Sequence, residues 1–121
     1  MRIAQVAPLF ESVPPKYYGG TERVVSYLTE ALVADGHDVT LYASGDSVTR
    51  ARLVAPCAQS LRLDQQCVDQ LAHHVLMLEL VTQDAEAYDV IHFHVDYLHF
   101  PVSRRLSTPH VALPIYRKSV V

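Results

Sequence analysis

The chain has 121 residues, of which 50% are hydrophobic and 19% are charged, a composition that is typical of one globular domain and excludes an intrinsically disordered protein. The formal net charge is −3 and the basic residues are scattered among acidic ones, which excludes nucleic acid as a partner. Cys57 and Cys67 lack metal-ligand spacing, no apolar run approaches the ~20 residues that cross a bilayer, and residues 1–10 do not resemble a secretory leader. We therefore expect a cytoplasmic protein with reduced cysteines and no transmembrane segment.

The first half of the chain predicts a strand, a helix and a second strand. Residues 3–7 form a short apolar run that ends at Pro8, which indicates a buried strand. The loop that follows is longer than the usual connection of about 2–6 residues, as functional loops often are. From Thr21, a suitable helix cap, apolar residues recur at helical spacing until Gly36, a suitable helix end, and residues 37–44 predict the second strand. The apolar positions assigned to the helix are Val24, Val25, Leu28, Ala31 and Leu32.

The second half continues the alternation. A third short strand is expected in residues 50–55, a helix in residues 61–80, a fourth strand in residues 89–94, a short helix near Phe100 and a fifth strand in residues 108–113. Alternating strands and helices predict an α/β fold of the Rossmann-like, doubly wound class with a mainly parallel sheet. In that class ligands bind at the carboxyl ends of the strands. The loop after the first strand and the end of the fourth strand are therefore expected to lie side by side.

The first candidate site is the run Gly19-Gly20-Thr21. Backbone amides without side chains in front of them, at the positive end of a helix, can hold a phosphate without a lysine. The alternative is that the glycines only let the chain turn and that Thr21 caps the helix. No dinucleotide or Walker-type glycine motif accompanies the pair, so the sequence of this loop leaves both interpretations open.

The second candidate site is the segment HFHVDYLH, which contains His92, His94, Asp96 and His99. His92 and His94 share one face of the expected strand, and the spacing superficially resembles the H-x-H-x-D-H metal motif of metallo-β-lactamase-like hydrolases, with one extra residue before the last histidine. Those enzymes need further ligands downstream, and few residues follow here. The alternatives are a structural His92 and a substrate-binding His94 at the strand end. His73 and His74 in the expected helix are interpreted as surface or capping residues.

In combination these segments resemble a known family. Residues 14–47, PPKYYGGTERVVSYLTEALVADGHDVTLYASGDS, and residues 88–97, YDVIHFHVDY, look like the N-terminal domain of the retaining glycosyltransferases of family 4, also called glycosyltransferase group 1, which have the GT-B fold. The resemblance covers residues 1–112. It depends on the order of several motifs: the first strand, the Gly-Gly-x-Glu loop, the Gly-His-Asp-Val turn and the Asp-Val-Ile-His-x-His strand.

The resemblance implies that a sugar is transferred from a nucleoside-diphosphate sugar to an acceptor hydroxyl with retention, without a metal or other cofactor. Gly19 and Gly20 match the loop whose amides approach the donor diphosphate, with Thr21 and Asp96 beside it, and His94 matches a histidine near the transferred sugar, the expected catalytic residue. Residues 1–113 are then the acceptor-side domain, residues 114–121 an unassigned tail, and the donor-binding C-terminal domain is absent.

Such a fragment is expected to have a sheet that is incomplete at its C-terminus, to be inactive alone and to self-associate through exposed edges. Two other functions remain as alternatives: a stand-alone phosphate- or nucleotide-binding α/β module, and a histidine-rich metal-binding hydrolase.

Overall fold

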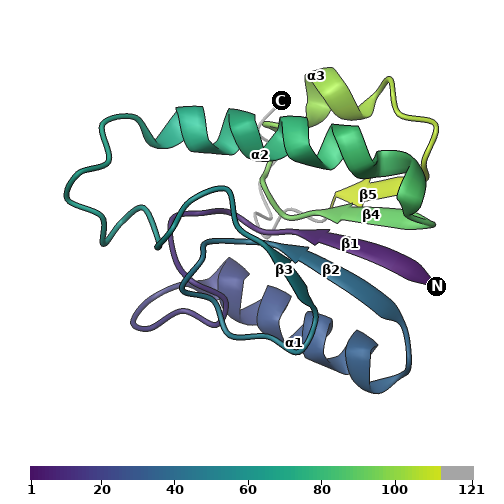
Figure 1. Cartoon of the computed structure of the whole chain (residues 1–121), viewed down its shortest axis with the longest axis horizontal. Helices are drawn as coiled ribbons and strands as arrows, with labels where there is room; N and C mark the ends of the chain where they lie inside the picture. Colours follow the sequence, from purple (N-terminus) through teal and green to yellow (C-terminus); the bar gives the residue numbers. More distant parts are fainter. Residues whose placement is uncertain (113–121) are drawn as a thin grey trace.

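A sheet of five parallel strands lies at the centre of the computed structural model, which describes residues 1–112 (Figure 1). The strand order is β3-β2-β1-β4-β5, so the first strand is central and both neighbours pair with it. This arrangement confirms the expected parallel α/β sheet. The strands are β1 (Arg2–Val6), β2 (Asp38–Tyr42), β3 (Arg52–Val54), β4 (Val90–Phe93) and β5 (His110–Ala112). The helices are α1 (Gly20–Ala34), α2 (Gln70–Asp84) and α3 (Phe100–Ser103), with a 3-10 turn at Ala85–Ala87.

The helices cover both faces of the sheet. Figure 1 shows α1 on one face and α2 with α3 on the opposite face. The larger core lies under α2, and its buried members include Val6, Tyr42, Leu61, Met77, Val81, Ile91 and Phe93. The core under α1 is smaller, with Ala7, Val13, Val25, Leu41 and Ala43. None of the helices in the described part of the chain has the length and apolar content that crossing a bilayer requires.

Helix α1 differs from the expected helix at its start but not at its end. The helix begins at Gly20, the N-cap residue is Gly19, and no side chain caps it. The prediction that Thr21 is the cap is therefore wrong, because the glycine pair lets the chain enter the helix two residues earlier. The other end is confirmed: Gly36 has φ 90°, the left-handed conformation that glycine adopts without steric cost.

The face that α1 turns to the sheet also differs from the expected one. Val25 is buried, but Val24 is 50% exposed, and the other buried residues are polar: Glu22, Ser26 and Thr29. The sheet below presents Gln5, a fully buried side chain on the same strand face as Ala7. The expected apolar stripe was wrong for Val24 and Ala31, which are both exposed, because polar residues make up most of the buried face of the helix.

The second long helix starts later than the expected residue 61. The Asp69 side chain accepts hydrogen bonds from the Leu71 and Ala72 N–H groups and so fixes the start of α2 at Gln70. Residues 61–69 form a loop in which Leu61 still packs in the core. The apolar residues of this loop recur at helical intervals, which is why the expected helix began too early. The expected tail, residues 114–121, lies outside the described residues.

Candidate functional site

The glycine loop and the end of β4 face the same pocket. This pocket has a volume of about 430 Å³ and lies at the carboxyl edge of the sheet. Gly19, Gly20 and Thr21 line one side, and His94 and Asp96 line another. The structure thus brings all five sequence-predicted site residues together. The remaining lining residues are Pro8, Phe10, Tyr18, Glu22, Arg62, His74, Val95 and Leu98.

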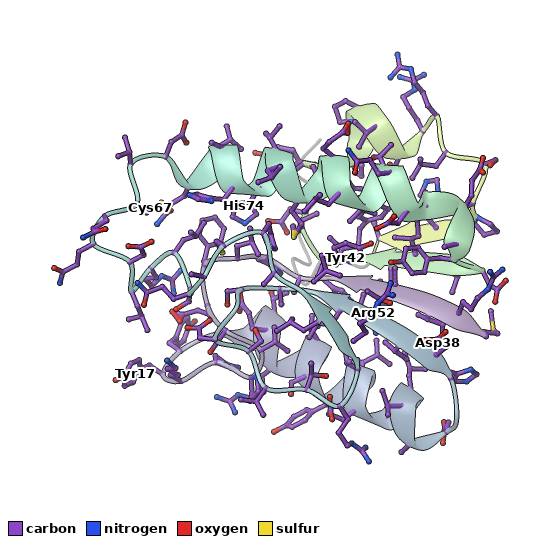
Figure 2. All side chains as sticks on the ribbon, viewed as in Figure 1. Tyr17, Asp38, Tyr42, Arg52, Cys67 and His74 are labelled. Carbon is purple, nitrogen blue, oxygen red and sulfur yellow. The ribbon has the colours of Figure 1, made fainter. Side chains whose placement is uncertain are left out.

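The first turn of α1 presents backbone amides to this pocket. The first hydrogen bond within the helix runs from the Arg23 N–H to the Gly19 carbonyl oxygen at 3.3 Å, so the N–H groups of residues 20–22 have no acceptor within the helix. A Cβ added at Gly20 would meet nothing within 4 Å, whereas one at Gly19 would lie 2.7 Å from Glu22 Oε1 and 3.0 Å from Pro15 Cβ. Gly20 therefore borders open space, and Gly19 is closely covered. Figure 2 shows Tyr17, in the same loop, pointing away from the body of the protein, where it is 77% exposed.

His94 is held in place by the sheet. Its backbone N–H donates to the Val6 carbonyl oxygen at 2.9 Å, and its Nε2 lies 2.9 Å from Gln5 Oε1. With Gln5 Oε1 as the partner, the ring proton lies on Nε2 and Nδ1 is an acceptor. Burial, with a contribution from nearby His92, lowers the pKa of His94 to about 3. The imidazole is therefore neutral at pH 7 and is a weak base.

Asp96 differs from His94 in its exposure. It is a solvent-exposed residue with φ 55°, a left-handed conformation that aspartate tolerates better than most residues. It turns the chain between β4 and α3 at the pocket rim. Its carboxylate is therefore available to solvent and to a ligand.

Sequence reasoning missed a group of three charged residues: Arg62 and Glu22, which line this pocket, and Glu11, which binds Arg62. Arg62 Nη1 donates to Glu11 Oε1 at 2.8 Å, and Glu11 Oε2 is buried without a partner. Glu22 is only 6% exposed. Burial, followed by the nearby Glu11 carboxylate, raises the pKa of Glu22, and Arg62 opposes this shift. The Gly-Gly-x-Glu spacing pointed to Glu22, but no local signal marked Glu11 or Arg62, which lie 51 positions apart.

His74 is a buried residue, so the prediction of a surface or capping role is wrong. It points from α2 toward the loop after β1 (Figure 2), and its side chain accepts a hydrogen bond at Nε2 from the Leu9 N–H at 3.0 Å. Its Nδ1 lies 2.8 Å from the Gln70 carbonyl oxygen, and its ring packs 4.6 Å from that of Phe10. These bonds fix a neutral tautomer with the proton on Nδ1. Desolvation accordingly lowers the pKa of His74.

The three histidines of HFHVDYLH do not face a common point at which a metal ion could bind. The rings of His92 and His94 lie 3.9 Å apart on the α1 side of the sheet. His99 stacks on Phe93, 4.3 Å away, and Phe93 belongs to the core under α2. Within residues 1–112, no three His, Cys, Asp or Glu side chains are grouped so that they could hold a metal ion. The geometry therefore gives the metal-binding interpretation no support.

Comparison with known proteins gives a family match. Residues 18–114 match the family model described as Glycosyltransferase Family 4. No curated protein matches the chain. Among solved structures it is similar to AviGT4, described as a glycosyltransferase involved in avilamycin A biosynthesis, with a TM-score of 0.58 and 22% sequence identity. The similarity covers 95% of this chain and 32% of the AviGT4 chain, and it shows a common Rossmann-like fold.

Proposed function

Because the chain belongs to glycosyltransferase family 4, we propose that residues 1–113 form the acceptor-side domain of a GT-B enzyme. This enzyme transfers a sugar from a nucleoside-diphosphate sugar to an acceptor hydroxyl with retention at the anomeric carbon. One observation carries the proposal: the free amides of Gly20 and Thr21 and the side chain of His94 line one pocket. A cytoplasmic location stays a prediction.

The charges of the reaction suit this pocket. When the glycosidic bond to the donor breaks, negative charge develops on the leaving diphosphate, and N–H groups at a helix end stabilise it without proton transfer. Neutral His94 is too weak a base to remove a proton at pH 7. Its role in the proposal is to accept a hydrogen bond at Nδ1 from a sugar or acceptor hydroxyl and so to position that group. Asp96, at the rim of the pocket, can accept a hydrogen bond from a second hydroxyl group.

In this proposal turnover also needs a donor-binding domain. The chain covers 32% of the AviGT4 chain, and one wall of a cleft does not exclude water or align two substrates. We expect negligible transfer by the 121-residue chain alone. Binding of the donor diphosphate to Gly19, Gly20 and Thr21 is the part of the function that this chain can test by itself.

Replacing Gly20 with alanine is expected to weaken nucleoside-diphosphate binding without loss of stability. The new Cβ enters open space in the folded protein, and alanine is a better helix residue than glycine, so the melting temperature should be unchanged or slightly higher. In the complex, however, the methyl group would hold a phosphate away from the amides. Loss of one hydrogen bond to a charged group costs about 1.5–3 kcal/mol, or roughly a tenfold to hundredfold weaker affinity.

The measurement uses UDP, GDP and ADP as probes, with amide chemical shifts of the ¹⁵N-labelled chain as the readout. At least one probe should shift the Gly20 and Thr21 resonances in the original protein. Glu79→Gln is a suitable control because Glu79 is exposed on α2, away from the residues that line the pocket. The proposal is contradicted if no probe moves these resonances, or if Gly20→Ala binds as tightly as the original chain.

We also propose that the isolated chain self-associates. Within residues 1–112 the sheet has β3 and β5 as its edge strands, and Val111 in β5 is 46% exposed. Open strand edges and exposed apolar side chains favour pairing between chains. Sedimentation at increasing protein concentration should therefore show a dimer or larger species, and a strictly monomeric profile would contradict this prediction.

A further inference from the structure

We propose that the Glu22 carboxylate occupies the anion position at the start of α1 when no ligand is bound, so that a phosphate group enters by displacing it or together with a proton. This inference rests on the proposed function, since it describes how the same loop is regulated. It makes Glu22 an internal competitor of the phosphate.

The position of Glu22 is the first observation. Glu22 is in the first turn of α1 and lines the pocket with Gly19 and Gly20. Its Oε1 lies 2.7 Å from the point where a Cβ on Gly19 would stand, so the carboxylate folds back over the N-cap residue. Its own backbone N–H partly opposes the rise in the pKa of this carboxyl. The carboxylate therefore lies at the end of the helix where a phosphate would bind.

The surrounding charges are the second observation. Among the described residues that line the pocket, Arg62 is the only lysine or arginine, and its guanidinium is bound to Glu11. The other titratable residues at the pocket are His74 and His94, both kept neutral by burial, Asp96 at the rim and Tyr18 in the loop. Within residues 1–112, therefore, the pocket lining offers Glu22 no cation other than Arg62. A dianion beside an ionised Glu22 would therefore be repelled, and removal of this charge should favour binding.

Burial gives the expected direction of the pH dependence. The pKa of Glu22 is raised, first by desolvation and then by Glu11, so this carboxyl takes up a proton more readily than an ordinary glutamate. An anion close to it would raise the pKa further. Binding should therefore be accompanied by proton uptake and should weaken as the pH rises and Glu22 becomes fully ionised.

The test is a titration with inorganic sulfate, whose charge does not change between pH 6 and pH 8, followed through the Gly20 and Thr21 amide resonances of the full chain. Glu22→Gln keeps the shape of the side chain and removes its charge. At pH 8 this variant should bind sulfate on the order of tenfold more tightly than the original protein. The difference should narrow as the pH is lowered, because Glu22 in the original protein then takes up a proton. The control Glu79→Gln removes one charge from the exposed face of α2 and should leave the affinity within twofold.

The possible outcomes separate the two proposals. If sulfate shifts these amides with the same affinity and pH dependence in the original protein and in Glu22→Gln, the role of Glu22 is overturned while the phosphate loop stands. If sulfate and the nucleoside diphosphates shift them in no variant, both proposals fail. Should Glu22→Gln not fold, Glu22→Asp withdraws the carboxylate by one methylene, and an affinity equal to that of the original protein would then overturn the inference.

Discussion

Replacing His74 with alanine is expected to lower the free energy of unfolding by about 3 kcal/mol. His74 is 1% exposed and accepts a hydrogen bond from the Leu9 N–H. The substitution leaves this N–H buried without its acceptor, removes the contact with the ring of Phe10, and creates a cavity beside the pocket. Urea unfolding at pH 7, followed by circular dichroism, measures the loss.

His73→Ala is the matched control, because His73 is the neighbouring residue of α2, is only half-buried and has no such bond to the loop after β1. We expect it to cost less than 1 kcal/mol. Equal losses for the two variants would show that the bond between α2 and this loop does not contribute to stability. A loss of stability confined to His74→Ala would show that His74 holds the loop after β1 to α2.

Lowering the pH from 7 to 5 is expected to destabilise the protein steeply. Burial lowers the pKa of His74, His92, His94 and His99, to about 3 for His94 and about 4 for His99. Below pH 6.5 the unfolded chain binds protons at these histidines and the folded chain binds fewer, so stability falls as the pH falls. Four such groups give a slope of at most roughly 5 kcal/mol per pH unit.

Two sets of carboxyl groups modify this curve. The raised pKa of Glu22 has the opposite sign, since the folded protein binds that proton first. The lowered pKa values of Glu30 and Asp46 add to acid destabilisation only at lower pH, near the normal range of a carboxyl group. Urea unfolding at pH 7, 6 and 5 and at constant ionic strength checks the prediction. A free energy of unfolding that is constant over this range would refute the claim that the histidines are buried in the neutral form.

Much of the fold could be predicted because the strand segments are locally distinct. The run at residues 3–7 contains most of β1, and that at residues 89–94 contains all of β4. The rule that ligand sites lie at the carboxyl ends of parallel strands then correctly predicted that His94 lies near the glycine loop. Helix starts were less predictable. The start of α1 depends on a glycine N-cap without a side-chain bond, and that of α2 on Asp69.

The charged and buried parts of the site could not be predicted because they depend on contacts between distant segments. The acceptor for the Leu9 N–H comes from a helix 65 positions later, and the partner of Glu11 comes from the loop between β3 and α2. Nothing in the local sequence around His74 distinguishes it from its neighbour His73. Which of the two is buried depends on which side of α2 faces the loop after β1, where His74 contacts Leu9 and Phe10.

The polar underside of α1 has a consequence for the motion of the protein. Val25 is the only apolar residue among the buried residues of this helix, and Thr29 Oγ1 is buried without a partner, whereas α2 buries Met77, Leu78 and Val81. Segments held by few apolar contacts open at a lower free energy than the rest of a protein. A ligand that binds the first turn of α1 opposes this opening by mass action. Ligand binding at the glycine loop is therefore thermodynamically coupled to the local opening of α1: the more of the loop is occupied, the smaller the fraction of protein in which the helix is open.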